Sequence, residues 1–134
     1  MLYGEDVYVR YRYFEKMDIA PLYSFGHGLS YTKFQLSDLK VERRSPKEVV
    51  VHIIVTNVGS RAGGEVIQPY IGHQSPRINR PPKELKGFQK AYLEPEVKVI
   101  VQIVLDVACA TSFWDEYRDK WCSEAGVYSI GGNE

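Results

Sequence analysis

The sequence contains little cysteine: Cys109 and Cys122 are the two among 134 residues. Two cysteines are too few for a disulfide scaffold, in which several bridges stand in for a hydrophobic core. They could form one disulfide across a hairpin if the chain were extracellular, although their spacing alone does not establish the required geometry. We therefore favour two unpaired, half-buried thiols.

An excess of charge and long apolar runs are also missing. Lys and Arg number 17, as do Asp and Glu, so charge gives no reason to expect a nucleic-acid or membrane partner. The uncharged apolar stretches are far shorter than the roughly 20 residues of a membrane span. Residues 1–6 have neither a basic start nor an apolar core, which argues against a secretory signal and leaves the localisation unknown.

A sustained period of 3.6 residues is absent too, which predicts little helix. Residues 97–107, VKVIVQIVLDV, alternate apolar and polar side chains and predict a strand with one buried side. Residues 49–59 are apolar on both sides and predict a central strand, with residues 64–72 returning beside it as a hairpin. Pro69 lies within the returning strand and predicts an edge or a bulge there.

Shorter segments complete this pattern. In residues 34–41 the apolar positions change parity, which predicts a bulge. Residues 7–14, VYVRYRYF, predict an aromatic strand, residues 112–121 a short hairpin, and residues 126–130 a closing strand. Six to eight short strands in a chain of one-domain length predict an all-β fold, an antiparallel two-sheet sandwich of the fibronectin type III or immunoglobulin kind.

Catalytic side chains are hard to find in this pattern. Hydrolysis of a glycoside needs two carboxylates about 5–10 Å apart, one with a raised pKa. The acidic clusters, at residues 5–6, 115–116 and 119, lie in polar contexts that do not raise a carboxyl pKa. His27, His52 and His73 share no metal-ligand spacing, and we expect His52 at the surface or a sheet edge. We expect no catalytic residue, metal or cofactor.

His27 lies between two glycines in residues 21–34, PLYSFGHGLSYTKF. Gly26 and Gly28 would let the backbone turn sharply or approach another chain closely. Phe25, Leu29 and Tyr31 could anchor such a turn in the core. The residues alone favour a turn whose histidine forms local hydrogen bonds over a ligand or a catalytic base.

The same motifs resemble those of a known family. EDVYVRYRYFEKMDIAPLYSFGHGLSYTKF, VTNVGSRAGGEVIQPYIG, RPPKELKGFQKAYLEP and SFWDEYRDKW follow one another here as in the C-terminal fibronectin type III-like domain of glycoside hydrolase family 3 β-glucosidases. The resemblance implies that residues 1–20 are a linker and first strand leading from catalytic domains, and that residues 21–134 are the fibronectin type III-like domain. The family's catalytic Asp and Glu lie in the preceding domains, so no catalytic residue carries over.

The resemblance also implies a function and its partners. The module would pack on and stabilise catalytic domains that hydrolyse terminal β-D-glucosyl residues in a parent enzyme of a family with many secreted members. An exposed aromatic patch is then expected, with Tyr8, Tyr11, Tyr13, Phe14 and Tyr23 as candidates. We expect an interdomain docking loop at Tyr11, Arg12, Tyr13, Phe25, Gly26, His27 and Gly28.

A stand-alone module that binds β-glucan or an oligosaccharide is the alternative. Trp114 and Trp121 are its candidate sugar contacts, although we favour a hairpin pair packed on the sheet for these two residues.

The sequence departs from the family pattern at several positions. Asp6 and Arg10 stand where the pattern has glycine, and Pro69 replaces an apolar residue that favours strands. A proline there should remove one hydrogen bond from the ladder. The final segment, GVYSIGGNE, is shorter than usual, and we expect the chain to be a fragment of a longer protein.

Because the sequence lacks a carboxylate pair, the purified chain should not hydrolyse a chromogenic β-glucoside. A continuous absorbance assay would measure this. Turnover that is abolished by a single Asp or Glu substitution would contradict the prediction.

Overall fold

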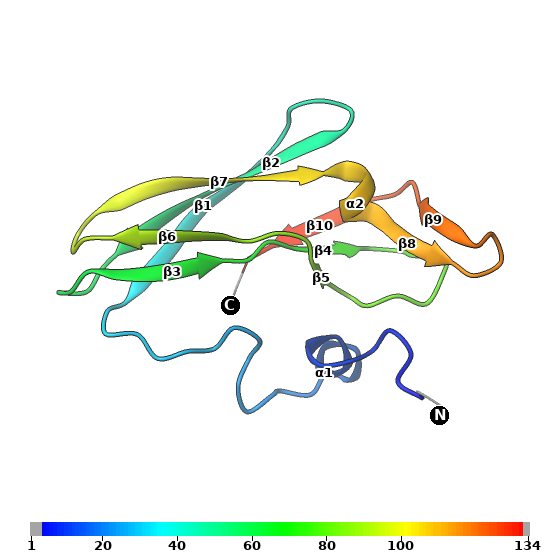
Figure 1. Ribbon diagram of the computed structural model, residues 1–134, viewed down its shortest axis with the longest axis horizontal. Helices are drawn as coiled ribbons and strands as arrows, with labels where there is room; N and C mark the ends of the chain where they lie inside the picture. The colour runs from blue at the N-terminus through cyan, green and yellow to red at the C-terminus, as the bar shows by residue number, and fades with distance from the viewer. Residues whose placement is uncertain (1–3, 133–134) are drawn as a thin grey trace.

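The strands form two facing layers (Figure 1) in the computed structural model, which describes residues 4–132. One layer is an antiparallel sheet of order β1-β2-β7, with β1 at Phe34–Arg43, β2 at Glu48–Asn57 and β7 at Lys98–Asp106. The other layer contains two smaller sheets. One is the pair of β3 (Gly63–Ile67) and β6 (Gln89–Leu93). The second has the order β10-β4-β5, with β10 at Tyr128–Gly131, β4 at Tyr70–His73 and β5 at Glu84–Leu85. The predicted antiparallel sandwich is confirmed.

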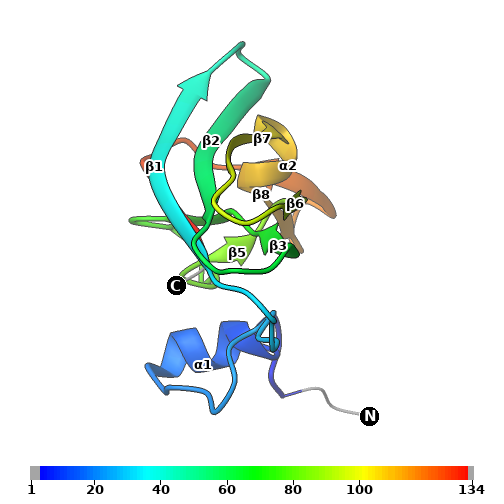
Figure 2. The same cartoon turned by 90° about the vertical axis from the view of Figure 1, so that its left-hand side faces the viewer.

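Two helices and a hairpin lie outside these layers. Helix α2 (Val107–Thr111) follows β7 and leads to the hairpin of β8 (Ser112–Asp115) and β9 (Lys120–Ser123), which confirms the predicted hairpin. Helix α1 (Tyr11–Met17) lies beneath the strands in both views (Figure 2). No helix among residues 4–132 is long and apolar enough to cross a membrane.

Several details of the strands follow the sequence pattern. The register of β1 against β2 shifts between Ser37 and Lys40, where Asp38 takes a positive φ of 53°, so the predicted bulge is confirmed. In β7, exposed positions alternate with buried or half-buried ones from Lys98 to Asp106. Both cysteines are unpaired, as favoured, but Cys122 alone is half-buried, since Cys109 is exposed. A hydrogen bond to Asp106 raises the pKa of the Cys109 thiol, which disfavours the reactive thiolate.

The predicted pairing of residues 64–72 is wrong. Strand β2 pairs with β1 and β7, whereas β3 pairs with β6. Pro69 is fully buried between β3 and β4, and because it has no N–H the chain leaves one ladder there and joins β10 and β5. His52 is not at a sheet edge, since it lies on the central strand β2, with its Nε2 atom 3.3 Å from a Glu42 oxygen.

The predicted strand at residues 7–14 is also wrong, because this segment enters helix α1. Positive φ angles at Arg10 (57°) and Asp18 (52°) bound the helix and are incompatible with a continuous strand. A helix of seven residues is too short to be stable alone, so contacts with the rest of the chain must hold it.

The core lies between the two layers. In the first sheet, Val51 is opposite Ile103 and Ile53 is opposite Val101. These side chains are buried against residues of the second layer, namely Ile67, Ile71, Ala91 and Leu93. Burial of each large aliphatic side chain contributes about 1.5–3 kcal/mol, so this interlayer contact supplies most of the stability.

Asn57 is a fully buried polar residue at the end of β2. Its Oδ1 accepts hydrogen bonds from the Thr32 hydroxyl at 2.6 Å and the Gly59 N–H at 3.1 Å. Its Nδ2 donates to the carbonyls of Arg61 at 2.8 Å and Leu93 at 3.1 Å. The amide is therefore fully satisfied, and it joins Thr32, the turn at residues 59–61 and the end of β6.

Replacement of Asn57 by Ala should lower the free energy of unfolding by about 2–4 kcal/mol, because buried partners lose their hydrogen bonds. Urea unfolding would measure this, with exposed Gln35→Ala as the control, expected within about 0.5 kcal/mol of the parent chain. Equal effects of the two substitutions would contradict the assigned role of the amide.

Candidate functional site

Helix α1 is attached to the sandwich by side chains that reach residues 79–85. The Leu85 N–H donates to the Tyr11 hydroxyl at 2.9 Å, and the Lys83 Nζ lies 2.8 Å from a Glu15 oxygen. The Tyr8 hydroxyl and the Lys16 Nζ both donate to the Asn79 side chain, at 2.5 and 3.2 Å. These bonds fix both the helix and the segment that leads into it.

Glu84 lies at the centre of the attachment. Its half-buried carboxylate is 3.4 Å from Arg12, 3.0 Å from Arg80 and 3.5 Å from Lys86. Arg80 is itself buried and also donates to the Thr111 carbonyl at 3.2 Å. One carboxylate thus connects α1, the loop before β5 and the end of α2, with three cations to compensate its burial.

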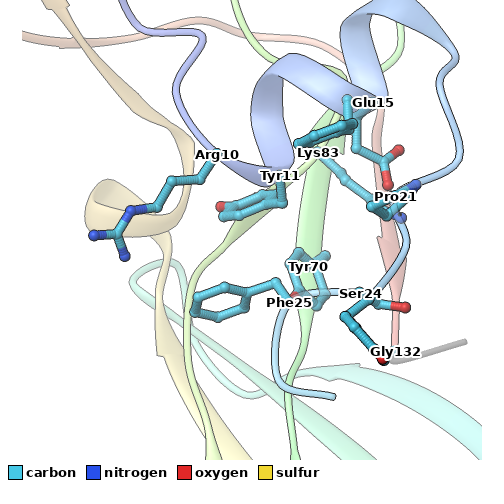
Figure 3. Close-up of a pocket in the computed structure, with 11 residues that line it drawn as sticks. Arg10, Tyr11, Glu15, Pro21, Ser24, Phe25, Tyr70, Lys83 and Gly132 are labelled. Atoms are coloured by element: carbon cyan, nitrogen blue, oxygen red, sulfur yellow. Dashed lines mark ion pairs between the residues drawn. The ribbon is translucent and has the colours of Figure 1, made fainter.

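A groove of about 500 Å³ opens between α1 and residues 21–25 (Figure 3). Tyr70 is buried at its base, and the Tyr11 ring lies 5.7 Å from that of Tyr70 and 5.5 Å from that of Phe25. Burial raises the pKa of Tyr70, and Tyr11 and Glu15 raise it further. Among residues 4–132, Glu15 is the one carboxylate that lines the groove, and it is paired with Lys83. The groove therefore lacks the two carboxylates of a glycosidase site.

Two further carboxylates, Asp115 and Glu65, lie outside the groove. Asp115 accepts hydrogen bonds from the backbone of Tyr117 and Arg118 and stabilises the β8–β9 turn. Burial raises the pKa of Glu65, but this residue lies on β3 and does not line the groove. Among residues 4–132, no three His, Cys, Asp or Glu side chains gather where they could hold a metal ion.

His27 lies in a turn at the edge of the groove. The backbone N–H of His27 donates to the Ser24 carbonyl at 3.0 Å. Its side chain is exposed, and the ring centroid lies 5.0 Å from that of Tyr23. Gly26 has a φ of +86°, and a Cβ there would lie 3.0 Å from the Gln68 Nε2 atom. Gly26 is therefore required both for the turn and for close approach to Gln68, whereas Gly28 is exposed with open space around it.

The expected docking residues lie in different surroundings. Tyr11 and Arg12 contact the sandwich, whereas Tyr13 is exposed and lies edge-on against Phe14. The expectation that Leu29 and Tyr31 anchor the turn in the core is wrong, because their exposed fractions are 100% and 90%. Leu22, which the sequence reasoning did not select, is 89% exposed. The absence of charged residues around Leu22 in the sequence was the signal that could have marked it as a contact residue.

Trp114 and Trp121 face each other across the β8–β9 hairpin. Their ring centroids are 5.7 Å apart and the planes are inclined by 77°. They are 47% and 68% exposed. The two rings form an edge-to-face pair, and they do not share one flat surface on which successive sugar rings could stack.

Asp6 and Arg10 have strained backbone conformations. Their φ angles are 52° and 57°, and Arg10 combines its positive φ with a ψ of −132°. Only glycine adopts such conformations without cost. The family pattern has glycine at both positions, so the structure supplies a conformational reason for that pattern.

Comparisons with known proteins agree with this architecture. Residues 65–131 match the fibronectin type III-like domain family. The chain belongs to that family. In Figure 1, the matched region includes β3, β4, β6 and β10 of one layer and β7 of the other.

The relatives are β-glucosidases. A protein of Aspergillus fumigatus named "Probable beta-glucosidase I" is 48% identical over 97% of this chain, which spans 16% of that protein. The crystal structure of the Kluyveromyces marxianus β-glucosidase with glucose is 42% identical over 98% of this chain and 16% of its own, with a TM-score of 0.88. The crystal structure of a β-glucosidase from Streptomyces venezuelae is 36% identical over 98% of this chain and 17% of its own, with a TM-score of 0.90. The fibronectin type III-like chain thus corresponds to a small C-terminal portion of these enzymes.

Replacement of Arg10 by Gly should stabilise the chain by about 1 kcal/mol. Relief of a strain of about 1–3 kcal/mol exceeds the entropic cost of glycine, about 0.5–1 kcal/mol. Thermal denaturation would measure this, with Arg10→Ala as the control that keeps the positive φ. Equal midpoints for the two variants would contradict the strain assignment.

Proposed function

We propose that this chain is a non-catalytic module of a family 3 β-glucosidase, which packs on and stabilises catalytic domains that hydrolyse terminal β-D-glucosyl residues. One observation carries the proposal: nearly the whole chain matches β-glucosidases, yet it spans 16% of their length. The groove with its single, ion-paired carboxylate supports a non-catalytic role. The remaining part of such an enzyme would supply the catalytic groups.

The attachment of α1 suggests how the module connects to its partner. In this proposal residues 1–20 lead from the catalytic domains, and residues 21–134 form the domain itself. The bonds of Tyr11, Arg12 and Glu15 to the sandwich hold the described part of this connection against it. The module would therefore be joined rigidly, and its stability would add to that of the domains before it.

A chimaera tests the proposal. This chain would replace the matching part of the Kluyveromyces marxianus β-glucosidase, to which it is 42% identical. The chimaera should be soluble and should hydrolyse a chromogenic β-glucoside, whereas deletion of the same part should reduce soluble activity several-fold by destabilising the enzyme. Full activity of the deleted enzyme would contradict the proposal.

Calorimetry with cellobiose and a soluble β-glucan tests the carbohydrate-binding alternative. That alternative is favoured by the exposure of Trp121. The chain should give a cooperative melt and no binding heat if it only supports catalytic domains. Saturable heat that disappears in Trp114→Ala or Trp121→Ala would assign carbohydrate binding to the hairpin instead.

A further inference from the structure

We infer that the uncharged segment at residues 19–32 is a preformed interface for the catalytic domains of the same polypeptide, with Ile19, Leu22, Tyr23, Leu29 and Tyr31 as its contact side chains. We call these five side chains the docking surface. The inference rests on the proposed function and goes beyond it, because it says which part of the module the partner covers.

The backbone of this segment is fixed at both ends and in the middle. At its start, the Ile19 N–H donates to the Phe14 carbonyl at 3.0 Å. In the middle, Gly26 lies against buried Gln68. At its end, the buried Thr32 side chain is bonded to Asn57. The segment has neither helix nor strand, yet its path is set by contacts with the sandwich.

The side chains between these fixed points project into solvent. Leu29 is fully exposed, and Leu22, Tyr23 and Tyr31 are mostly exposed. A single exposed leucine needs no explanation, but several large apolar side chains exposed on one anchored segment are a feature typical of a protein interface. Because the backbone is already ordered, little conformational entropy would be lost when a partner covers them.

The composition of the segment fits a permanent partner. Residues 19–32 contain no Asp, Glu, Lys or Arg, although 25% of the whole chain is charged. Depletion of charge at the centre is typical of interfaces, and obligate interfaces are the most apolar of these.

Chain length and position identify this partner as the preceding domains. The chain spans 16% of its β-glucosidase relatives, so most of such a protein lies outside this structure. Residues 19–32 follow α1, and both lie on the same side of the strand layers (Figure 2). Under the proposed function, residues 1–20 connect to the catalytic domains, and their helix α1 lies on the same side as the docking surface.

The chimaera with the Kluyveromyces marxianus enzyme provides the test. The docking variant carries Leu22→Ser, Leu29→Ser and Tyr31→Ser. The control variant carries Tyr92→Ser, Tyr117→Ser and Val127→Ser, which replace exposed large hydrophobic side chains that lie elsewhere. Both variants would be made in the isolated chain and in the chimaera, and thermal midpoints and soluble β-glucosidase activity would be measured.

The docking variant should reduce the soluble activity of the chimaera several-fold and lower its midpoint, while the control variant should not. In the isolated chain, the docking variant should shift the midpoint by less than about 2 °C, because the replaced side chains touch solvent there.

Two results would overturn the inference while leaving the proposed function intact: an active chimaera that tolerates the docking variant, or one that loses activity equally with both variants. An isolated chain that dimerises in sedimentation and is made monomeric by the docking variant would assign the surface to a second copy and so overturn it too. Failure of the unmodified chimaera to fold would instead reject the proposed function, and this inference with it.

Discussion

The side-chain amide of Asn57 is the interaction on which the arrangement of the chain depends. It makes four hydrogen bonds in a place that water does not reach, and these go to three stretches of the chain: Thr32, the turn at residues 59–61, and Leu93. A buried amide of this kind is costly unless every bond is made, so it tolerates one arrangement of its neighbours. Through Thr32 it also fixes where residues 19–32 join the sandwich. The aliphatic core supplies the free energy of folding, and Asn57 supplies much of its uniqueness.

A second set of polar bonds extends this order to α1. Glu84 binds Arg12 and Arg80, and Arg80 reaches the carbonyl at the end of α2. The helix has too few residues to be stable without such partners. The polar groups of α1 and of the loop before β5 thus bond to each other, whereas Leu22, Leu29 and Tyr31 are almost fully exposed. This contrast is the physical basis for assigning the attachment to the module and the apolar segment to its partner.

The sequence predicted those features that local pattern determines. Alternation in β7 and the parity change in β1 both follow from the twofold period of a strand, so their burial and the bulge were correctly predicted. The pairing of β3 was missed because Pro69 indicates a break but not which strand the chain joins next.

Helix α1 was missed because its alternating aromatic and basic residues imitate a strand. Its stabilising partners lie in residues 79–85, far along the sequence. The exposure of Leu29 and Tyr31 could not be predicted. In the sequence, an apolar residue that contacts another domain looks the same as an apolar residue of the core.

The central claim is that the docking surface is exposed in the isolated module and covered in the intact enzyme. Hydroxyl-radical footprinting with mass spectrometry measures side-chain accessibility residue by residue and would compare the isolated chain with the active chimaera. The account predicts that Leu22, Leu29 and Tyr31 react in the isolated chain and are protected in the chimaera, while Tyr117 reacts in both. Equal reactivity of the three residues in the two proteins would contradict it.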